Sequence, residues 1–286
     1  MAIVLDNITY TYGMGTPFEK TALHGVSLTI ENGEFLGVIG HTGSGKSTFV
    51  QHLNGLLHPT TGTVTVNGVD ISASTEEAKK MRHKVGMVFQ YPEHQLFEET
   101  IAQDIAFGPK NLGLSADDVD ERVRDAMKFV GLDYDTYAER SPFHLSGGQM
   151  RRVAIAGVVA MNPDFLVLDE PSAGLDPFGR EEIFEEIIRL HKEKGITVIL
   201  VSHNMEDISR MASRLVVLDK GRVVLDGEPM DIFNNHRDEL QAVGVDVPPV
   251  SVTMEYLREQ GLDVSNRVLS VDDAVQAILE GGSHVK

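Results

Sequence analysis

Cysteine is absent from this chain of 286 residues, and basic residues are few beside acidic ones. The lack of cysteine excludes disulfides, thiolate metal sites and cysteine nucleophiles, and it agrees with a reducing compartment. Lysine and arginine number 25 against 43 aspartates and glutamates, which gives a formal net charge of −18. Because affinity for nucleic-acid phosphates comes mostly from cations, this charge argues against a nucleic-acid partner and against adsorption to anionic lipid.

Long hydrophobic runs are also missing. The longest strand-like run, Ile196 to Val201, is far shorter than the roughly eighteen apolar residues that cross a bilayer. The stretch from Met1 to Tyr10 carries an acid at Asp6 and lacks the basic-then-apolar layout of a secretory signal. The 11 histidines have no paired ligand spacing, so a metal cluster is not expected. We therefore expect a cytosolic chain whose membrane association is peripheral.

Strand and helix signals alternate along most of the chain, which predicts an α/β fold with a mostly parallel sheet and covering helices. Two hairpin signals add antiparallel strands: Asn67-Gly68 between β-branched runs, and the turn Asp219-Lys220-Gly221. Buried strands are expected at residues 35–39, 85–89, 165–168 and 196–201, and helices at about residues 45–57 and 176–194.

Strand signals vanish between about residues 91 and 160. Ser115 can cap a helix there, and apolar residues recur at helical spacing after it. We therefore expect an inserted helical subdomain. Further on, residues 244–249 have the composition of a linker, and Ser270 with Asp273 forms a capping box before one more helix. The expected boundary lies between a main domain, 1–240, and a C-terminal extension, 241–286.

A glycine-rich segment follows the first buried strand and precedes a helix, and it matches the P-loop pattern G-x-x-x-x-G-K-[ST]. Its glycines let backbone N–H groups face phosphate, and the helix adds its positive N-terminal end. Lys46 is expected to hold the β- and γ-phosphates and Ser47 to bind Mg²⁺. By itself the motif fits ATPases, GTPases and small-molecule kinases alike. The expected nucleotide-binding residues are Gly40, His41, Thr42, Gly43, Ser44, Gly45, Lys46, Ser47 and Thr48.

Two adjacent acids follow a later buried strand, at the edge where α/β sheets bind ligands. Asp169 is expected to hold Mg²⁺, directly or through water, and Glu170 to orient and deprotonate an attacking water. Paired acids after a strand also occur as plain capping or surface residues. The P-loop upstream favours the catalytic interpretation.

The segment Leu145-Ser146-Gly147-Gly148-Gln149 resembles the signature motif of ATP-binding cassette (ABC) ATPases in every position. The resemblance implies a P-loop NTPase fold of the ABC type, with an antiparallel β subdomain, an inserted helical subdomain and here a small C-terminal helical extension. In that family the Ser hydroxyl, the glycine amides and the following helix bind the γ-phosphate of ATP held by the opposite subunit. Such a chain needs a second ATPase chain to complete its site.

Other positions match the family one by one. Gln90 resembles the Q-loop glutamine that contacts Mg²⁺ and the lytic water. Asp176 resembles the D-loop acid at the subunit contact, and His203 resembles the switch histidine that contacts the γ-phosphate and keeps Glu170 and water aligned. Tyr12 resembles the aromatic that stacks on adenine, and Tyr10 or Phe18 could take that role instead.

The resemblance is more specific at Gln90 to Thr100 and Asp104 to Pro109, which look like the ATPase component of energy-coupling-factor (ECF) transporters. Gly15 to Glu19, and Met150 to Gly157 after the signature, look like the second of the two paired ATPases. This implies an importer of vitamins or metal ions such as cobalt and nickel, built from two ATPases, a transmembrane coupling subunit and a substrate-binding membrane subunit. The chain would lie on the cytoplasmic face of the membrane, and its extension would touch the partner ATPase.

Several alternatives stay open at this point. Leu96 and Phe97 either dock the coupling subunit or pack inside the helical subdomain. A soluble ABC mechanoenzyme usually carries tandem cassettes or a long coiled-coil insertion, and a binding-only ATP clamp would have Glu170 or His203 replaced. For the partner ATPase, a paralogue is favoured over a second copy. The sequence does not identify the transported compound, because no residue of this chain would contact it.

Overall fold

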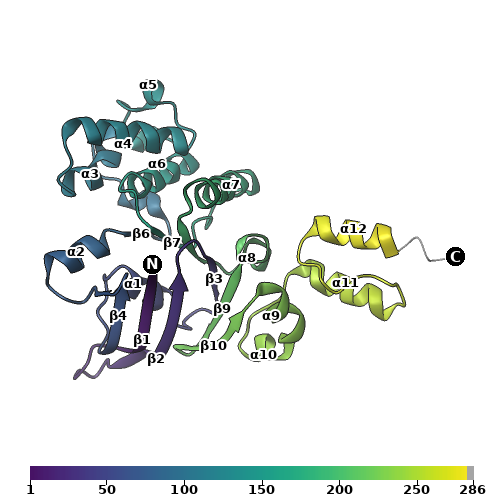
Figure 1. Ribbon diagram of the computed structural model, residues 1–286. Helices are drawn as coiled ribbons and strands as arrows, with labels where there is room; N and C mark the ends of the chain where they lie inside the picture. The colour runs from purple at the N-terminus through teal and green to yellow at the C-terminus, as the bar shows by residue number, and fades with distance from the viewer. Residues whose placement is uncertain (282–286) are drawn as a thin grey trace.

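Two β-sheets form the framework of the chain in the computed structural model, which describes residues 1–281 (Figure 1). One sheet has four strands in the order β2-β1-β4-β5, and the other has six in the order β10-β9-β3-β8-β7-β6. The strands are β1 (Ala2–Tyr12), β2 (Lys20–Glu31), β3 (Phe35–Ile39), β4 (Thr61–Val66), β5 (Val69–Asp70), β6 (Val85–Val88), β7 (Phe165–Asp169), β8 (Thr197–Val201), β9 (Arg214–Asp219) and β10 (Arg222–Gly227).

Helices cover the six-stranded sheet and form a separate group above it (Figure 1). No helix among residues 1–281 is both long enough and apolar enough to span a membrane. The helices are α1 (Lys46–Leu53), α2 (Glu76–Arg82), η1 (Pro92–Gln95), α3 (Ile101–Asn111), α4 (Ala116–Phe129), α5 (Tyr134–Tyr137), η2 (Pro142–His144), α6 (Gly147–Val159), α7 (Pro177–Lys194), α8 (Met205–Met211), α9 (Pro229–Asn235), α10 (Arg237–Ala242), α11 (Pro249–Glu259) and α12 (Val271–Gly281).

The six-stranded sheet is parallel except for its edge strand β10, as the alternating signals predicted. Every residue of β3, β6, β7 and β8 is buried, because continuous apolar runs suit strands that are covered on both faces. Parallel pairing brings the carboxyl ends of these strands to one edge. The P-loop, Gln90, Glu170 and His203 all come shortly after strands that end there, and Asp169 is the last residue of β7.

The four-stranded sheet is antiparallel, which confirms the predicted β subdomain. Its β4–β5 hairpin turns at Asn67 and Gly68, whose φ angles are 52° and 81°. Positive φ at both positions is what a two-residue turn of type I′ requires, so this part of the sequence signal was specific. The long strands β1 and β2 had no expected bounds.

The predicted helical subdomain is present as η1, α3, α4, α5, η2 and α6, and Ser115 caps α4 as expected. One helix differs from its prediction: α1 ends at Leu53 instead of Leu57. Asn54 caps it and Gly55 then adopts a φ of 73°, which reverses the chain before the apolar residues that follow.

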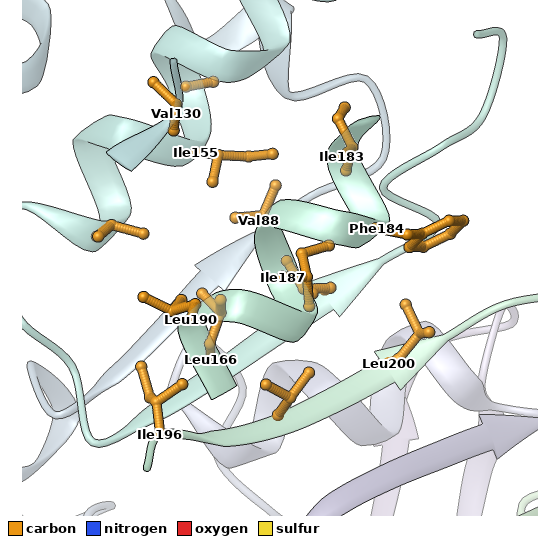
Figure 2. Packing of buried hydrophobic residues seen from close by; sticks show 14 of the residues in the cluster. Val88, Val130, Ile155, Leu166, Ile183, Phe184, Ile187, Leu190, Ile196 and Leu200 are labelled. Carbon is orange, nitrogen blue, oxygen red and sulfur yellow. The ribbon is translucent and has the colours of Figure 1, made fainter. Parts of the chain in front are cut away.

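The main core joins the six-stranded sheet to the helical subdomain through α7. Figure 2 shows Ile187 and Leu190 of α7 facing the strands that carry Leu166 and Leu200. Val130 and Ile155 of the helical subdomain belong to the same cluster of buried residues. A continuous core of this kind lets a displacement of one part act on the other, since close-packed interiors transmit strain.

The C-terminal helices α11 and α12 pack on each other and project from one side of the molecule (Figure 1). Their own small core contains Met254, Val264, Val268 and Ala274. Ser270 caps α12, because its Oγ accepts from the Asp273 N–H at 3.1 Å, and the same hydroxyl donates to Asp273 Oδ2 at 2.7 Å. Leu240 and Val245, one on each side of the expected domain boundary, both pack in the main core. The boundary after residue 240 therefore stays a prediction.

Candidate active site

A cavity of about 950 Å³ opens at the carboxyl edge of the six-stranded sheet. It collects thirteen of the predicted site residues from five separate segments of sequence. These are Tyr12, Gly40, His41, Thr42, Gly43, Gly45, Lys46, Ser47, Thr48, Gln90, Asp169, Glu170 and His203.

The P-loop runs from the end of β3 into α1. Gly40 needs to be glycine, because its φ is 152° and a Cβ there would lie 2.3 Å from the Leu218 carbonyl oxygen. Lys46 Nζ donates to the carbonyl oxygens of Gly40 at 2.6 Å and His41 at 3.1 Å. Ser44 is the exception among the predicted P-loop residues, since its side chain is fully buried and does not line the cavity.

Burial shifts the pKa of two groups around the loop. It lowers the pKa of Lys46, while the charges of Glu170 and Asp169 oppose that shift. It raises the pKa of Asp169, opposed by a hydrogen bond from Ser47 and by the charge of Lys46. The cavity thus brings a positive group and two negative groups near one another, and a phosphate chain with its counter-ion can balance both charges.

Glu170 follows β7 in a left-handed backbone conformation, with a φ of 52°. Such a conformation is unfavourable for a residue with a Cβ and persists where the surroundings fix it. The Glu170 N–H donates to the Val201 carbonyl oxygen at 3.0 Å. Its Oε2 lies 2.7 Å from His203 Nδ1, with the Glu170 side chain 13% exposed and the imidazole 77% exposed. The structure therefore places in direct contact the two residues whose roles the family resemblance linked.

Three aromatic residues were candidates for the adenine contact, and the geometry favours Tyr12. Its ring lines the cavity and its hydroxyl lies 3.1 Å from Thr48 Oγ1 in α1. Tyr10 instead packs against His52 and the core beneath. Phe18 is 87% exposed and outside the cavity.

The signature segment lies outside the cavity of its own chain, as does Asp176. Ser146 caps α6 in a full capping box with Gln149, whose side chain also reaches the Tyr137 hydroxyl at 3.3 Å. At Gly147 and Gly148 a Cβ would meet no atom within 4 Å, so the helix end is open to a large ligand. Asp176 caps α7 by accepting from the Gly179 N–H at 2.7 Å.

Ser47, Gln90 and Asp169 supply the oxygen donors that Mg²⁺ prefers, and all three line one cavity. The hydrogen bond between Ser47 and Asp169 places two of these donors in direct contact. No cluster of three or more histidine, aspartate or glutamate side chains suited to a metal occurs in residues 1–281. The donor set therefore fits a cation that is shared with bound phosphates.

Several cavity residues were missed by sequence reasoning. The turn after β9 and the linker after α10 had been recognised only as connections, and nothing in their composition signals a ligand. The missed residues are Lys20, Thr21, Ala22, His24, Met205, Lys220, Gly221, Gly244, Val245 and Asp246.

The two hydrophobic residues after the Q-loop separate in the structure. Leu96 is 8% exposed and packs in the main core, so of the two alternatives left open by the sequence, packing inside the protein holds for it. Phe97 is 57% exposed and its ring stands edge-on to Phe107, at 4.9 Å between centroids.

The family model and the relatives that match this sequence all point to the same protein family. A family model described as ABC transporter matches residues 23–173. The energy-coupling factor transporter ATP-binding protein EcfA2 of Clostridium tetani is 53% identical over 280 residues, which cover 98% of this chain and 97% of its own. The EcfA2 protein of Clostridium acetobutylicum is 54% identical over 279 residues, with the same two coverages.

Solved structures agree. The cbiO1 protein of Clostridium perfringens, part of the ABC transporter complex cbiONQ, has a TM-score of 0.73 at 36% identity and covers 88% of this chain and 98% of its own. The ATP-binding cassette MJ0796, a dimer in a post-hydrolysis state with ADP and Pi, has a TM-score of 0.70 at 32% identity and covers 79% and 98%. The resemblance predicted from the sequence is confirmed, and the mechanoenzyme and clamp alternatives are not favoured. The chain belongs to the ABC transporter family and, within it, to the ATP-binding proteins of energy-coupling factor transporters.

Proposed function

We propose that this ATPase powers an ECF importer of vitamins or transition-metal ions from the cytoplasmic face of the membrane. The observation that carries the proposal is the Glu170–His203 pair beside the P-loop, in a cavity that lacks its own signature segment. Such a cavity holds the parts for cleaving a phosphoanhydride bond except the donors that the Ser146 segment supplies.

Each cavity residue has a proposed role. The Tyr12 ring stacks on adenine, and the P-loop amides with Lys46 hold the phosphates. Ser47, Gln90 and Asp169 would hold Mg²⁺, which neutralises charge that develops during phosphoryl transfer. These roles follow from residue type and position in the cavity.

Glu170 acts on the attacking water. Its carboxylate accepts a proton from the water as the water oxygen bonds to the γ-phosphorus. The bond from that phosphorus to the β,γ-bridging oxygen breaks, and ADP leaves. His203 holds Oε2 of that carboxylate at 2.7 Å, so the other oxygen is left to orient the water. The left-handed backbone conformation at Glu170 sets the direction in which its side chain leaves the main chain.

Completion of the site by a second ATPase chain follows from the open end of α6. Ser146, Gly147, Gly148 and Gln149 would bind the γ-phosphate of the partner's ATP, and Asp176 would lie at the contact between the chains. A paralogue is favoured as partner over a second copy. The dimeric state of MJ0796 supports pairing in general.

Contacts with membrane subunits are proposed on the helical subdomain. The Phe97–Phe107 pair offers an apolar anchor beside η1 for a transmembrane coupling subunit, which in turn joins a substrate-binding membrane subunit. The extension at 241–286 is proposed to contact the partner ATPase. No nucleic acid is expected to bind.

Two measurements test this function. The tagged chain, purified from membranes in mild detergent, should bring with it a second ATPase and two membrane proteins. Multiple-turnover phosphate release from that complex should continue well beyond one phosphate per site. Purification of the chain alone would contradict the transport role, and a single turnover would favour a binding-only clamp.

A further inference from the structure

Arg151 is a buried cation in α6, with 2% of its surface exposed. Its Nε and Nη2 donate to the Glu93 carboxylate at 3.2 Å and 3.1 Å, and its Nη1 donates to the Pro171 carbonyl oxygen at 3.0 Å. Glu93 is 17% exposed. Paired donation to one carboxylate fixes the plane of the guanidinium, and the third bond fixes its position along that plane.

The hydrogen bonds of Arg151 join three segments of the chain, and each segment carries residues with a proposed role in ATP hydrolysis. Glu93 lies in η1, shortly after Gln90, and Pro171 directly follows Glu170. Arg151 itself lies in the helix whose N-terminus is the Ser146 signature segment. The Arg151 guanidinium therefore connects two parts of the chain that serve different ATP sites. Gln90 and Glu170 belong to the site on this chain's own P-loop, and the Ser146 segment belongs to the site on the partner's P-loop.

Backbone strain occurs in the same two loops. Tyr91, between Gln90 and Glu93, has a φ of 56°, and Glu170, next to Pro171, has a φ of 52°. Left-handed conformations at residues other than glycine persist only where neighbouring contacts determine them. Arg151 makes such contacts to the groups just beyond both strained residues.

We propose that Arg151 is a positioning residue. Through it, binding of the partner's ATP at the Ser146 segment changes the positions of Gln90 and Glu170 in the same chain. When α6 closes on the γ-phosphate of the partner's ATP, the guanidinium moves η1 and the Glu170 loop with it. Binding at one site then sets the catalytic geometry of the other. The inference rests on the proposed function, because it needs two ATP sites shared between two chains.

The test compares Arg151→Met with wild type in the assembled ATPase complex. The methionine keeps much of the side-chain length and removes every hydrogen bond of the guanidinium to Glu93 and Pro171. We expect kcat to fall at least about tenfold, KM for ATP to stay within about twofold, and the Hill coefficient for ATP to fall to about 1. Arg151→Lys should restore part of kcat, because an ammonium reaches one acceptor but lacks the planar fork.

Two further variants keep the test decisive. Glu93→Gln retains the shape of the acceptor without its charge, so it should lower kcat and cooperativity even where Arg151→Met does not fold. Arg122→Met removes an arginine that donates to the Ala160 carbonyl oxygen at the far end of α6. It should behave like wild type in kcat and in the Hill coefficient.

Particular outcomes overturn the inference. Wild-type kcat and cooperativity in Glu93→Gln would do so, as would a change confined to KM. A Hill coefficient of 1 in the wild-type complex would also contradict coupling between the sites. Absence of any turnover in the wild-type complex would instead count against the proposed function itself.

Discussion

Glu186 lies on the α7 surface that faces the helical subdomain, with 12% of its side chain exposed. Its Oε1 lies 3.6 Å from Arg152 Nη1, and its Oε2 is buried with no hydrogen-bond partner. Burial raises the pKa of Glu186 from 4.5 to about 7, although the charges of Arg152 and Arg189 oppose the shift. An ionised carboxylate at this position therefore destabilises the fold.

The sign of the pH effect follows from proton binding. Between pH 4.5 and about 7 the folded chain holds a proton on Glu186 that the unfolded chain has released, so the free energy of unfolding falls as pH rises. The contribution is fully present below pH 4.5 and is lost as pH passes about 7. At about 1.4 kcal/mol per pKa unit, the cost of ionisation reaches about 3 kcal/mol at pH 8 and about 1 kcal/mol at pH 5.

Glu186→Gln should remove most of this cost, because the amide has the shape of the protonated acid and no charge. We expect it to raise the free energy of unfolding at pH 8 by about 2 to 3 kcal/mol and at pH 5 by about 1 kcal/mol or less. Urea midpoints at the two pH values measure the difference. Glu193→Gln, an exposed change of the same charge on the same helix, is the control. Equal effects of the two variants at pH 8 would refute the reasoning.

Three further predictions concern the nucleotide site and its partners. Tyr12→Ala should raise the KM for ATP about 5- to 150-fold with little change in kcat, since base stacking contributes roughly 1 to 3 kcal/mol; unchanged KM would return the role to Tyr10 or Phe18. Phe97→Ala should lower transport in vesicles and leave the ATPase activity of the soluble pair intact; equal loss of both would exclude docking. Tyr256→Ala combined with Val275→Ala removes exposed apolar side chains from α11 and α12, and it should weaken nucleotide-free pairing of the two ATPases roughly tenfold. An unchanged dissociation constant in sedimentation would contradict a dimerising extension.

The local parts of the site could be predicted because each is a short segment with its own physics. A glycine at position 40, a lysine in the first turn of a helix and two acids after a buried strand carry their chemistry within a few residues. The Asn67-Gly68 turn is another such case, since both φ angles are determined by residue type.

The parts that could not be predicted depend on contacts between distant segments. Arg151 and Glu93 are far apart in the chain, and no pattern marks either as a partner of the other. Leu96 and Phe97 are adjacent and equally apolar, so only the packing of the helical subdomain decides that one is buried and the other exposed. The residues of the 244–246 linker reach the cavity because the main core fixes Val245, which composition cannot reveal.

The central claim is that Glu170 activates the water in a site that another chain completes. The most direct test is Glu170→Gln in the paired ATPases, with phosphate release and sedimentation followed in the presence of ATP and Mg²⁺. We expect ATP binding to persist, turnover to fall at least about a hundredfold, and a closed ATP-bound dimer to accumulate. Lys46→Ala, as the matched comparison, should lose nucleotide binding first and form no such dimer. Normal turnover in the glutamine variant, or hydrolysis by a strictly monomeric chain, would contradict the claim.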